Sequence, residues 1–128
     1  MVRKFNFNKD SNNDMGFVLS CLSAGLINFD QLKEWLFYVI EQQDDYPTYF
    51  FDIIDLEDRR DFYEYEVIGY SPSWGYTDKT FKALRGIGYK RWPDYKNDGV
   101  SRKVGLKHLE ANPHIETRFR ETFPFIEW

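Results

Sequence analysis

The densest group of side chains with chemical potential lies between residues 41 and 66, where ten acids stand against two bases, Arg59 and Arg60. Neighbouring carboxylates can act as general acid and base, or can hold a divalent cation. They also attract basic proteins, because opposite potentials accelerate encounter and nearby aromatic rings supply contact area. The acids are Glu41, Asp44, Asp45, Asp52, Asp55, Glu57, Asp58, Asp61, Glu64 and Glu66.

The charge of this acidic segment is −8, although the whole chain carries only −4. Four aspartates in it, at positions 52, 55, 58 and 61, recur every three residues, and on a continuous helix they would form an acidic ridge. Like charges three or four residues apart destabilise a helix slightly, so an ordinary solvated face carries both signs. A solvated face and a divalent-cation site remain alternatives to partner binding. The predicted partner contacts are Asp52, Asp55, Asp58, Asp61, Tyr63 and Glu64.

A second candidate contact is the loop from Tyr70 to Tyr76, which contains Trp74 between two glycines. Tyrosine and tryptophan are common anchors of protein interfaces. The loop can present these rings to a partner, or it can fold Trp74 back over the core. Both interpretations fit the sequence, and we include Tyr70, Trp74 and Tyr76 in the predicted interface.

The histidines and the cysteine do not form a recognisable catalytic or metal motif. His108 and His114 are separated by Asn112-Pro113, which breaks a helix, and neither lies in an HExxH or Glu-x-x-His pattern. Cys21 lies among apolar neighbours without a histidine nearby, which favours a core thiol over a nucleophile. We therefore predict no metal, no cofactor and no enzymatic activity.

Two further patterns suggest chemistry that we do not predict. Gly86-Ile-Gly88 lacks the third glycine and the preceding strand of a dinucleotide fingerprint, and is interpreted as punctuation at a helix end. Residues 77–128 carry a charge of +4 and several aromatics, which could suggest nucleic acid. Acidic residues are scattered through this half, and the acidic segment would repel phosphate. We predict that the chain does not bind nucleic acid.

Composition places the chain among globular proteins. It has 128 residues, of which 42% are apolar, 30% charged and 20% aromatic, enough for one domain with an aromatic core. We predict a single helical domain over residues 1–128, with residues 1–10 irregular. A lone cysteine suggests a reducing compartment, and no apolar stretch has the length of a signal peptide or membrane span. We expect a soluble cytoplasmic protein that does not contact membranes.

Capping residues and apolar spacing predict helices throughout. Leu32, Trp35, Leu36, Val39 and Ile40 follow the i, i+3, i+4, i+7, i+8 pattern of one helical face. Residues 57–68 fit either a helix or an edge strand, and the absence of a partner strand favours a helix. The predicted fold class is all-α, an irregular bundle of six or seven helices. The expected helices run over about residues 13–24, from Asn28, Phe29 or Asp30 up to Asp44, over 47–56 and 57–68, from a Thr77 cap through Tyr89, from a Ser101 cap through Leu109, and from Asn112 to Phe123.

One part of the sequence resembles a known group of proteins. The run from Ala24 to Leu36, then Val39-Ile40, Tyr46-Pro47 and an acidic helix rich in Phe and Ile, is similar to small bacterial immunity proteins of polymorphic toxin systems. That group includes the immunity proteins of contact-dependent growth inhibition, and the resemblance covers about residues 17–56. It implies a cytosolic protein that binds a cognate toxin C-terminal domain, usually a nuclease. An adaptor that binds another basic protein and a metal-dependent carboxylate hydrolase are the alternatives.

Overall fold

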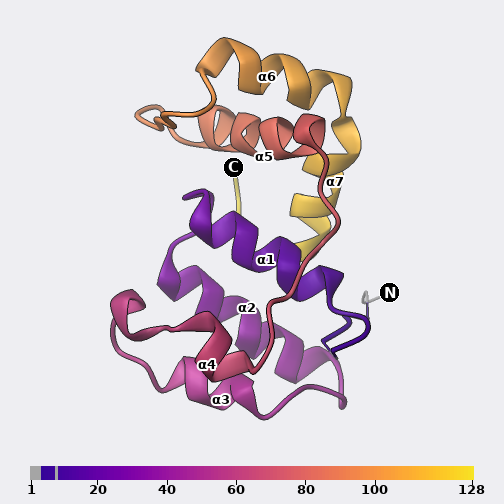
Figure 1. Cartoon of the computed structure of the whole chain (residues 1–128), viewed down its shortest axis with the longest axis vertical. Coiled ribbons are helices and arrows are strands. Elements are labelled where there is room, and N and C mark those ends of the chain that lie inside the picture. The colour runs from indigo at the N-terminus through magenta and orange to yellow at the C-terminus, as the bar shows by residue number, and fades with distance from the viewer. Residues whose placement is uncertain (1–3, 8) are drawn as a thin grey trace. The chain divides into compact units, whose positions relative to one another are not determined.

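The structure, a computed structural model, describes residues 4–7 and 9–128. These residues form seven α-helices and one short 3-10 helix, with no strand among them, so the predicted all-α class is confirmed. The chain divides into two compact units, Met1–Leu19 with Ile27–Trp74 and Ser20–Leu26 with Gly75–Trp128. The first helix, α1 (Asn13–Ser23), contributes its beginning to the first unit and its end to the second (Figure 1).

In the first unit, α2 (Phe29–Gln42) is the helix that the apolar spacing predicted. Asn28 caps it by accepting a 2.8 Å hydrogen bond from the backbone of Gln31, whose side chain accepts one of 3.0 Å in return. This reciprocal pair satisfies two backbone donors of the first turn, which fixes where the helix begins. The buried residues of the helix are Leu32, Trp35, Leu36 and Val39.

The core of this unit is aromatic and centres on Trp35, which is fully buried. The rings of Phe5, Phe7 and Phe50 lie with their centroids 5.5, 5.8 and 6.1 Å from the Trp35 ring. The Gln43 side chain accepts a 3.0 Å hydrogen bond from the Phe5 backbone and thereby holds residues 4–7 against the helix. The described part of the predicted irregular start is indeed not helical, yet it supplies two core rings.

Two short α-helices and a 3-10 helix complete the first unit: α3 (Tyr49–Ile54), the 3-10 helix Arg59–Asp61 and α4 (Glu64–Ile68). The helix predicted over 47–56 is thus shorter than expected, because Thr48 is its N-cap and Pro47 stays outside. Residues 57–68 contain helix rather than strand, as we favoured, but in two separate pieces. Figure 1 shows α3 and α4 beside each other below α2, and the contacts between α3 and α4 agree.

Because these helices are separate, the aspartates at positions 52, 55, 58 and 61 do not share one helical face. Asp58 has an extended backbone, with φ −127° and ψ 134°, and its side chain accepts a hydrogen bond from the Arg60 backbone. Aspartate side chains commonly form such hydrogen bonds to nearby backbone groups, and these bonds compete with continuation of a helix. Phe62 then has its own extended backbone and packs its buried ring 6.1 Å from the ring of Phe29. The extended backbone that places the Phe62 ring in the core also interrupts the helix between Asp61 and Glu64.

The second unit is built around three helices: α5 (Asp78–Arg91), α6 (Arg102–Ala111) and α7 (Pro113–Thr122). Thr77 and Ser101 cap the first two. Asn112 instead donates a 2.8 Å hydrogen bond to the carbonyl of His108, so its side chain closes α6 and makes no cap bond to α7. The helices α5 and α6 form a hairpin (Figure 1).

The interpretation of Gly86 and Gly88 as helix-end punctuation is wrong, because both lie inside α5. A Cβ on Gly86 would lie 2.8 Å from the backbone carbonyl carbon of Gly105 in α6. A Cβ on Gly88 would overlap the Tyr95 ring, whose hydroxyl donates a 2.6 Å hydrogen bond to the carbonyl of Ala24. These glycines allow close approach rather than ending the helix.

Among the residues that the structure describes, no helix combines the length and the apolar character needed to cross a bilayer.

Candidate functional site

The acidic segment of the first unit presents its carboxylates to solvent. Most of its acids are exposed, and so are the large rings of Phe51, Tyr63 and Tyr65, at 47%, 64% and 67%. We call this set, on α3, α4 and the link between them, the acidic aromatic surface. Its exposed members are Phe51, Asp52, Asp55, Glu57, Asp61, Tyr63, Tyr65 and Glu66.

Two predicted contact residues are partly neutralised inside the chain. Asp58 forms a 2.8 Å ion pair with Arg60, and hydrogen bonds from that arginine lower the pKa of the Asp58 carboxyl. Glu64 lies 3.7 Å from Arg59, yet its partial burial raises its pKa above the ordinary value. Because each has an arginine of the same segment beside it, both are weaker candidates for a partner than the sequence indicated.

Asp52, Asp55 and Asp61 are different. All three are exposed, and none forms an ion pair with another residue of the described chain. Their charges therefore face solvent, which is the condition for attracting a basic partner.

Buried neighbours hold this surface in place. Phe50 and Phe62 are buried within the first unit, between the exposed positions of the sequence. Lys33 of α2 donates a hydrogen bond to the carbonyl of Leu56, which attaches the link after α3 to that helix. The exposed rings of Phe51, Tyr63 and Tyr65 thus stand next to buried residues that anchor the same segment to the core. A surface held this way loses little conformational entropy on binding.

Two of the three rings of the Tyr70–Tyr76 loop contact other residues of the first unit, although four of the loop's seven residues are exposed. The Trp74 ring packs edge-on against the buried Phe17, with centroids 5.2 Å apart, and the Tyr70 hydroxyl donates to the carbonyl of Phe7. Tyr76 is 55% exposed, with its ring 5.9 Å from that of Phe81. Of the two interpretations of this loop, the structure has the one in which Trp74 covers the core.

The cysteine and the possible metal ligands of the sequence do not form a site in the described residues. Cys21 is fully buried, and burial raises the pKa of its thiol, so the reactive thiolate is disfavoured. Within the described residues, no three histidine, cysteine, aspartate or glutamate side chains gather as metal ligands.

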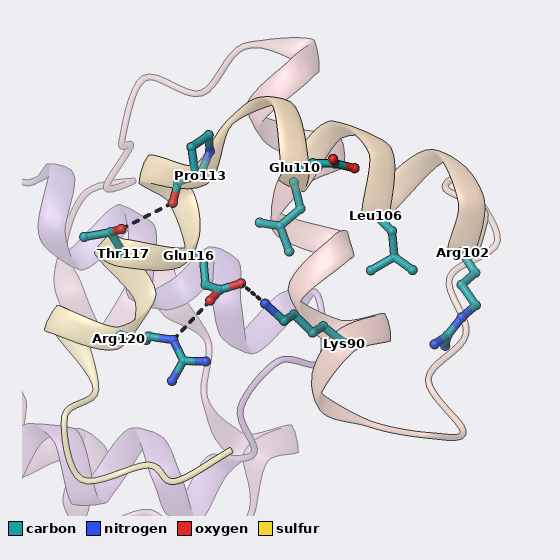
Figure 2. A pocket seen from close by; sticks show the side chains of 9 residues that line it. Lys90, Arg102, Leu106, Glu110, Pro113, Glu116, Thr117 and Arg120 are labelled. Carbon is teal, nitrogen blue, oxygen red and sulfur yellow. Dashed lines mark hydrogen bonds and ion pairs between the residues drawn. The ribbon is translucent and has the colours of Figure 1, made fainter.

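A groove of about 690 Å³ lies between α5, α6 and α7 of the second unit, and no pattern in the sequence indicates it. Figure 2 shows Lys90 of α5 and Arg120 of α7 directed at Glu116. The Glu116 carboxylate accepts 2.6 Å and 3.2 Å hydrogen bonds from Lys90 Nζ and Arg120 Nε. Spacing of four residues along α7 could have suggested the Glu116–Arg120 pair, but Lys90 comes from a different helix and leaves no local signal.

Glu116 should make stability depend on pH. Burial alone would raise the pKa of Glu116, but the hydrogen bonds and charges of Lys90 and Arg120 outweigh it and lower the pKa. A carboxyl with a lowered pKa in the folded state stabilises above its unfolded pKa, and this contribution is lost as the pH falls through the folded value. We expect Glu116→Gln to cost about 1 kcal/mol at pH 7 in urea unfolding, and progressively less from about pH 5 to pH 3.

Glu121→Gln is the matched control, because Glu121 is exposed on the same helix and outside the described ion pairs. Its effect on the free energy of unfolding at pH 7 should be small, because Glu121 is exposed. A Glu116→Gln difference that does not change with pH would contradict the stabilising bridge.

Comparisons of the chain with known protein families, characterised proteins and solved structures found no significant match. The candidate site therefore has to be judged on its own chemistry. That chemistry consists of exposed carboxylates and rings in the first unit and a groove with mixed charges in the second.

Proposed function

We propose that this chain is a binding protein without catalytic activity, and that its acidic aromatic surface binds a basic surface of another protein. The observation that supports this most is the exposure of Phe51, Tyr63 and Tyr65 among carboxylates, of which Asp52, Asp55 and Asp61 form no ion pair within the described residues. Exposed charge accelerates encounter, while aromatic rings that become buried at the centre of an interface supply most of its affinity.

The partner we propose is the C-terminal domain of a cognate bacterial toxin, most simply a nuclease. Proteins that grip the phosphate backbone present lysine and arginine to it, so a domain of this kind has a basic surface for carboxylates to cover. The resemblance of residues 17–56 to immunity proteins points to the same partner. In this function the chain acts in the cytoplasm, where it prevents the toxin from reaching nucleic acid.

The direct experiment is co-expression with the C-terminal domain of a toxin whose gene adjoins that of this chain, where such a gene is found, scored by growth and by nuclease activity in vitro. The proposed function requires that the chain restores growth and suppresses cleavage. If the two proteins co-purify but the cells still die, the chain is an adaptor for a basic protein and not an immunity protein.

Tyr63→Ala and Tyr65→Ala should each weaken toxin binding about tenfold, because truncating an interface anchor commonly costs more than 1 kcal/mol. Both rings are more than 60% exposed, so the free energy of unfolding should change little. Isothermal titration calorimetry measures the first effect and urea unfolding the second. Phe37→Ala is the control, since this ring is also exposed, at 50%, but is not part of the acidic aromatic surface. Equal losses in all three variants would remove the tyrosines from the proposed interface.

A further inference from the structure

The groove in the second unit has the size and the mixture of side chains of a ligand site. Its volume of about 690 Å³ lies within the range of about 300 to 1,000 Å³ that is usual for binding pockets. Leu106, Leu109 and Pro113 provide apolar lining, and the cations Lys90, Arg102 and Arg120 come from three different helices. None of these residues belongs to the acidic aromatic surface.

The arginines of the groove are oriented by other groups. The Arg120 guanidinium carbon lies 4.0 Å from the centroid of the Trp128 ring, and its Nε donates to Glu116. Stacking and a hydrogen bond fix the plane of the guanidinium and leave its terminal nitrogens for a further acceptor. Arg102 donates one 3.2 Å hydrogen bond to the carbonyl of Tyr89 and, within the described residues, forms no ion pair. Arginine held in this way is suited to binding carboxylates.

The order of charges limits where a ligand can carry its negative groups. Arg102 begins α6, and the Lys90–Glu116–Arg120 cluster lies near the other end of that helix (Figure 2). Glu110 lies on α6 about two turns after Arg102 and is exposed, so it repels a carboxylate placed near it. Between the two cationic ends, Leu106 and Leu109 favour apolar groups.

We propose that this groove binds a short, extended acidic peptide that has carboxylates at its ends and apolar side chains in its centre. The ten residues of α6 span about 15 Å at 1.5 Å per residue. An extended chain covers that length in about five residues at roughly 3.3 Å each. One end carboxylate pairs with Arg102 and the other with the terminal nitrogens of Arg120, while the central side chains cover the leucines. The partner is a protein segment, distinct from the basic partner of the acidic aromatic surface.

The test uses a fluorescein-labelled pentapeptide, Asp-Leu-Ala-Leu-Glu, titrated with the full chain and followed by fluorescence anisotropy. We expect a Kd below about 1 mM, weakened at least tenfold when both acids of the peptide are replaced by their amides. Arg102→Gln and Arg120→Gln should each weaken binding about tenfold. Lys103→Gln is the matched control, because Lys103 is exposed on α6 and outside the groove lining. This control should bind the peptide as the unchanged chain does.

In the peptide titrations, three results would each overturn the proposal: no binding of the peptide at 1 mM protein, equal binding of the amide peptide, or equal loss in the Lys103→Gln control. Inorganic phosphate serves as a competitor, and displacement of the peptide at equal concentration would identify a simple anion site instead. Circular dichroism checks that the arginine variants stay folded. Leu106→Gln adds a variant that changes no charge and should also weaken binding. Growth protection against a toxin plays no part in this experiment, so its outcome is independent of the proposed function.

Discussion

Gly86→Ala is expected to lower the free energy of unfolding by about 2 kcal/mol, measured by urea denaturation. In an isolated helix the same change stabilises by up to about 1 kcal/mol, so the packing cost has to exceed that gain. The reason for the cost is backbone contact. The new Cβ would lie 2.8 Å from the Gly105 carbonyl carbon and 2.9 Å from Leu109 Cβ, and neither α6 nor its backbone can move away without opening the hairpin.

Two other glycines provide graded controls. A Cβ on Gly105 would lie 3.1 Å or more from its neighbours, so Gly105→Ala should cost less than about 1 kcal/mol. Gly99→Ala would meet only Asn97 Oδ1 at 3.5 Å, an ordinary contact, and should be close to neutral. If Gly86→Ala is as stable as the unchanged chain, the backbones of α5 and α6 are not in close contact at Gly86 and Gly105.

The helices with complete local signals were the ones that could be predicted from the sequence. The Asn28 cap and the Leu32–Ile40 spacing define α2 within one turn of the chain, and Thr77 and Ser101 similarly begin α5 and α6. The prediction of a helix end at Gly86 was wrong, because glycine both ends helices and permits two helices to approach closely. Only the packing of Gly105 of α6 against Gly86 distinguishes a close-approach glycine from a helix-ending one, and that packing depends on tertiary structure.

The candidate site could be predicted in composition but not in detail. The sequence indicated a surplus of carboxylates, and the structure leaves Asp52, Asp55 and Asp61 exposed. It could not say which rings are buried, since Phe50 and Phe51 are adjacent and only Phe51 faces solvent. Short helices with breaks do not follow a single period, so side-chain direction between Leu56 and Tyr63 depends on how Phe62 reaches the core.

The second large effect is expected from reversing charge on the acidic aromatic surface. Asp55→Lys combined with Asp61→Lys should slow association with the proposed toxin domain by about one to two orders of magnitude at low salt. The physical reason is steering: the two substitutions change the local charge by four units at residues that form no ion pair with any other residue the structure describes. Dissociation should change far less, because rim charges act mainly on encounter. Stopped-flow fluorescence over a range of salt concentrations measures both rates.

This experiment needs a control that separates the effect of where the charges lie from the effect of net charge on the association rate. Glu121→Lys combined with Glu127→Lys makes the same change in net charge on exposed residues of the second unit. Because steering acts mainly through the charges at the contact surface itself, this control should retain most of the association rate. Asp58→Lys is unsuitable for the purpose, since it would also remove the N-cap of the 3-10 helix. Equal slowing in both double variants would mean that net charge alone attracts the partner, and residues 51–66 would then have no special part in recognition.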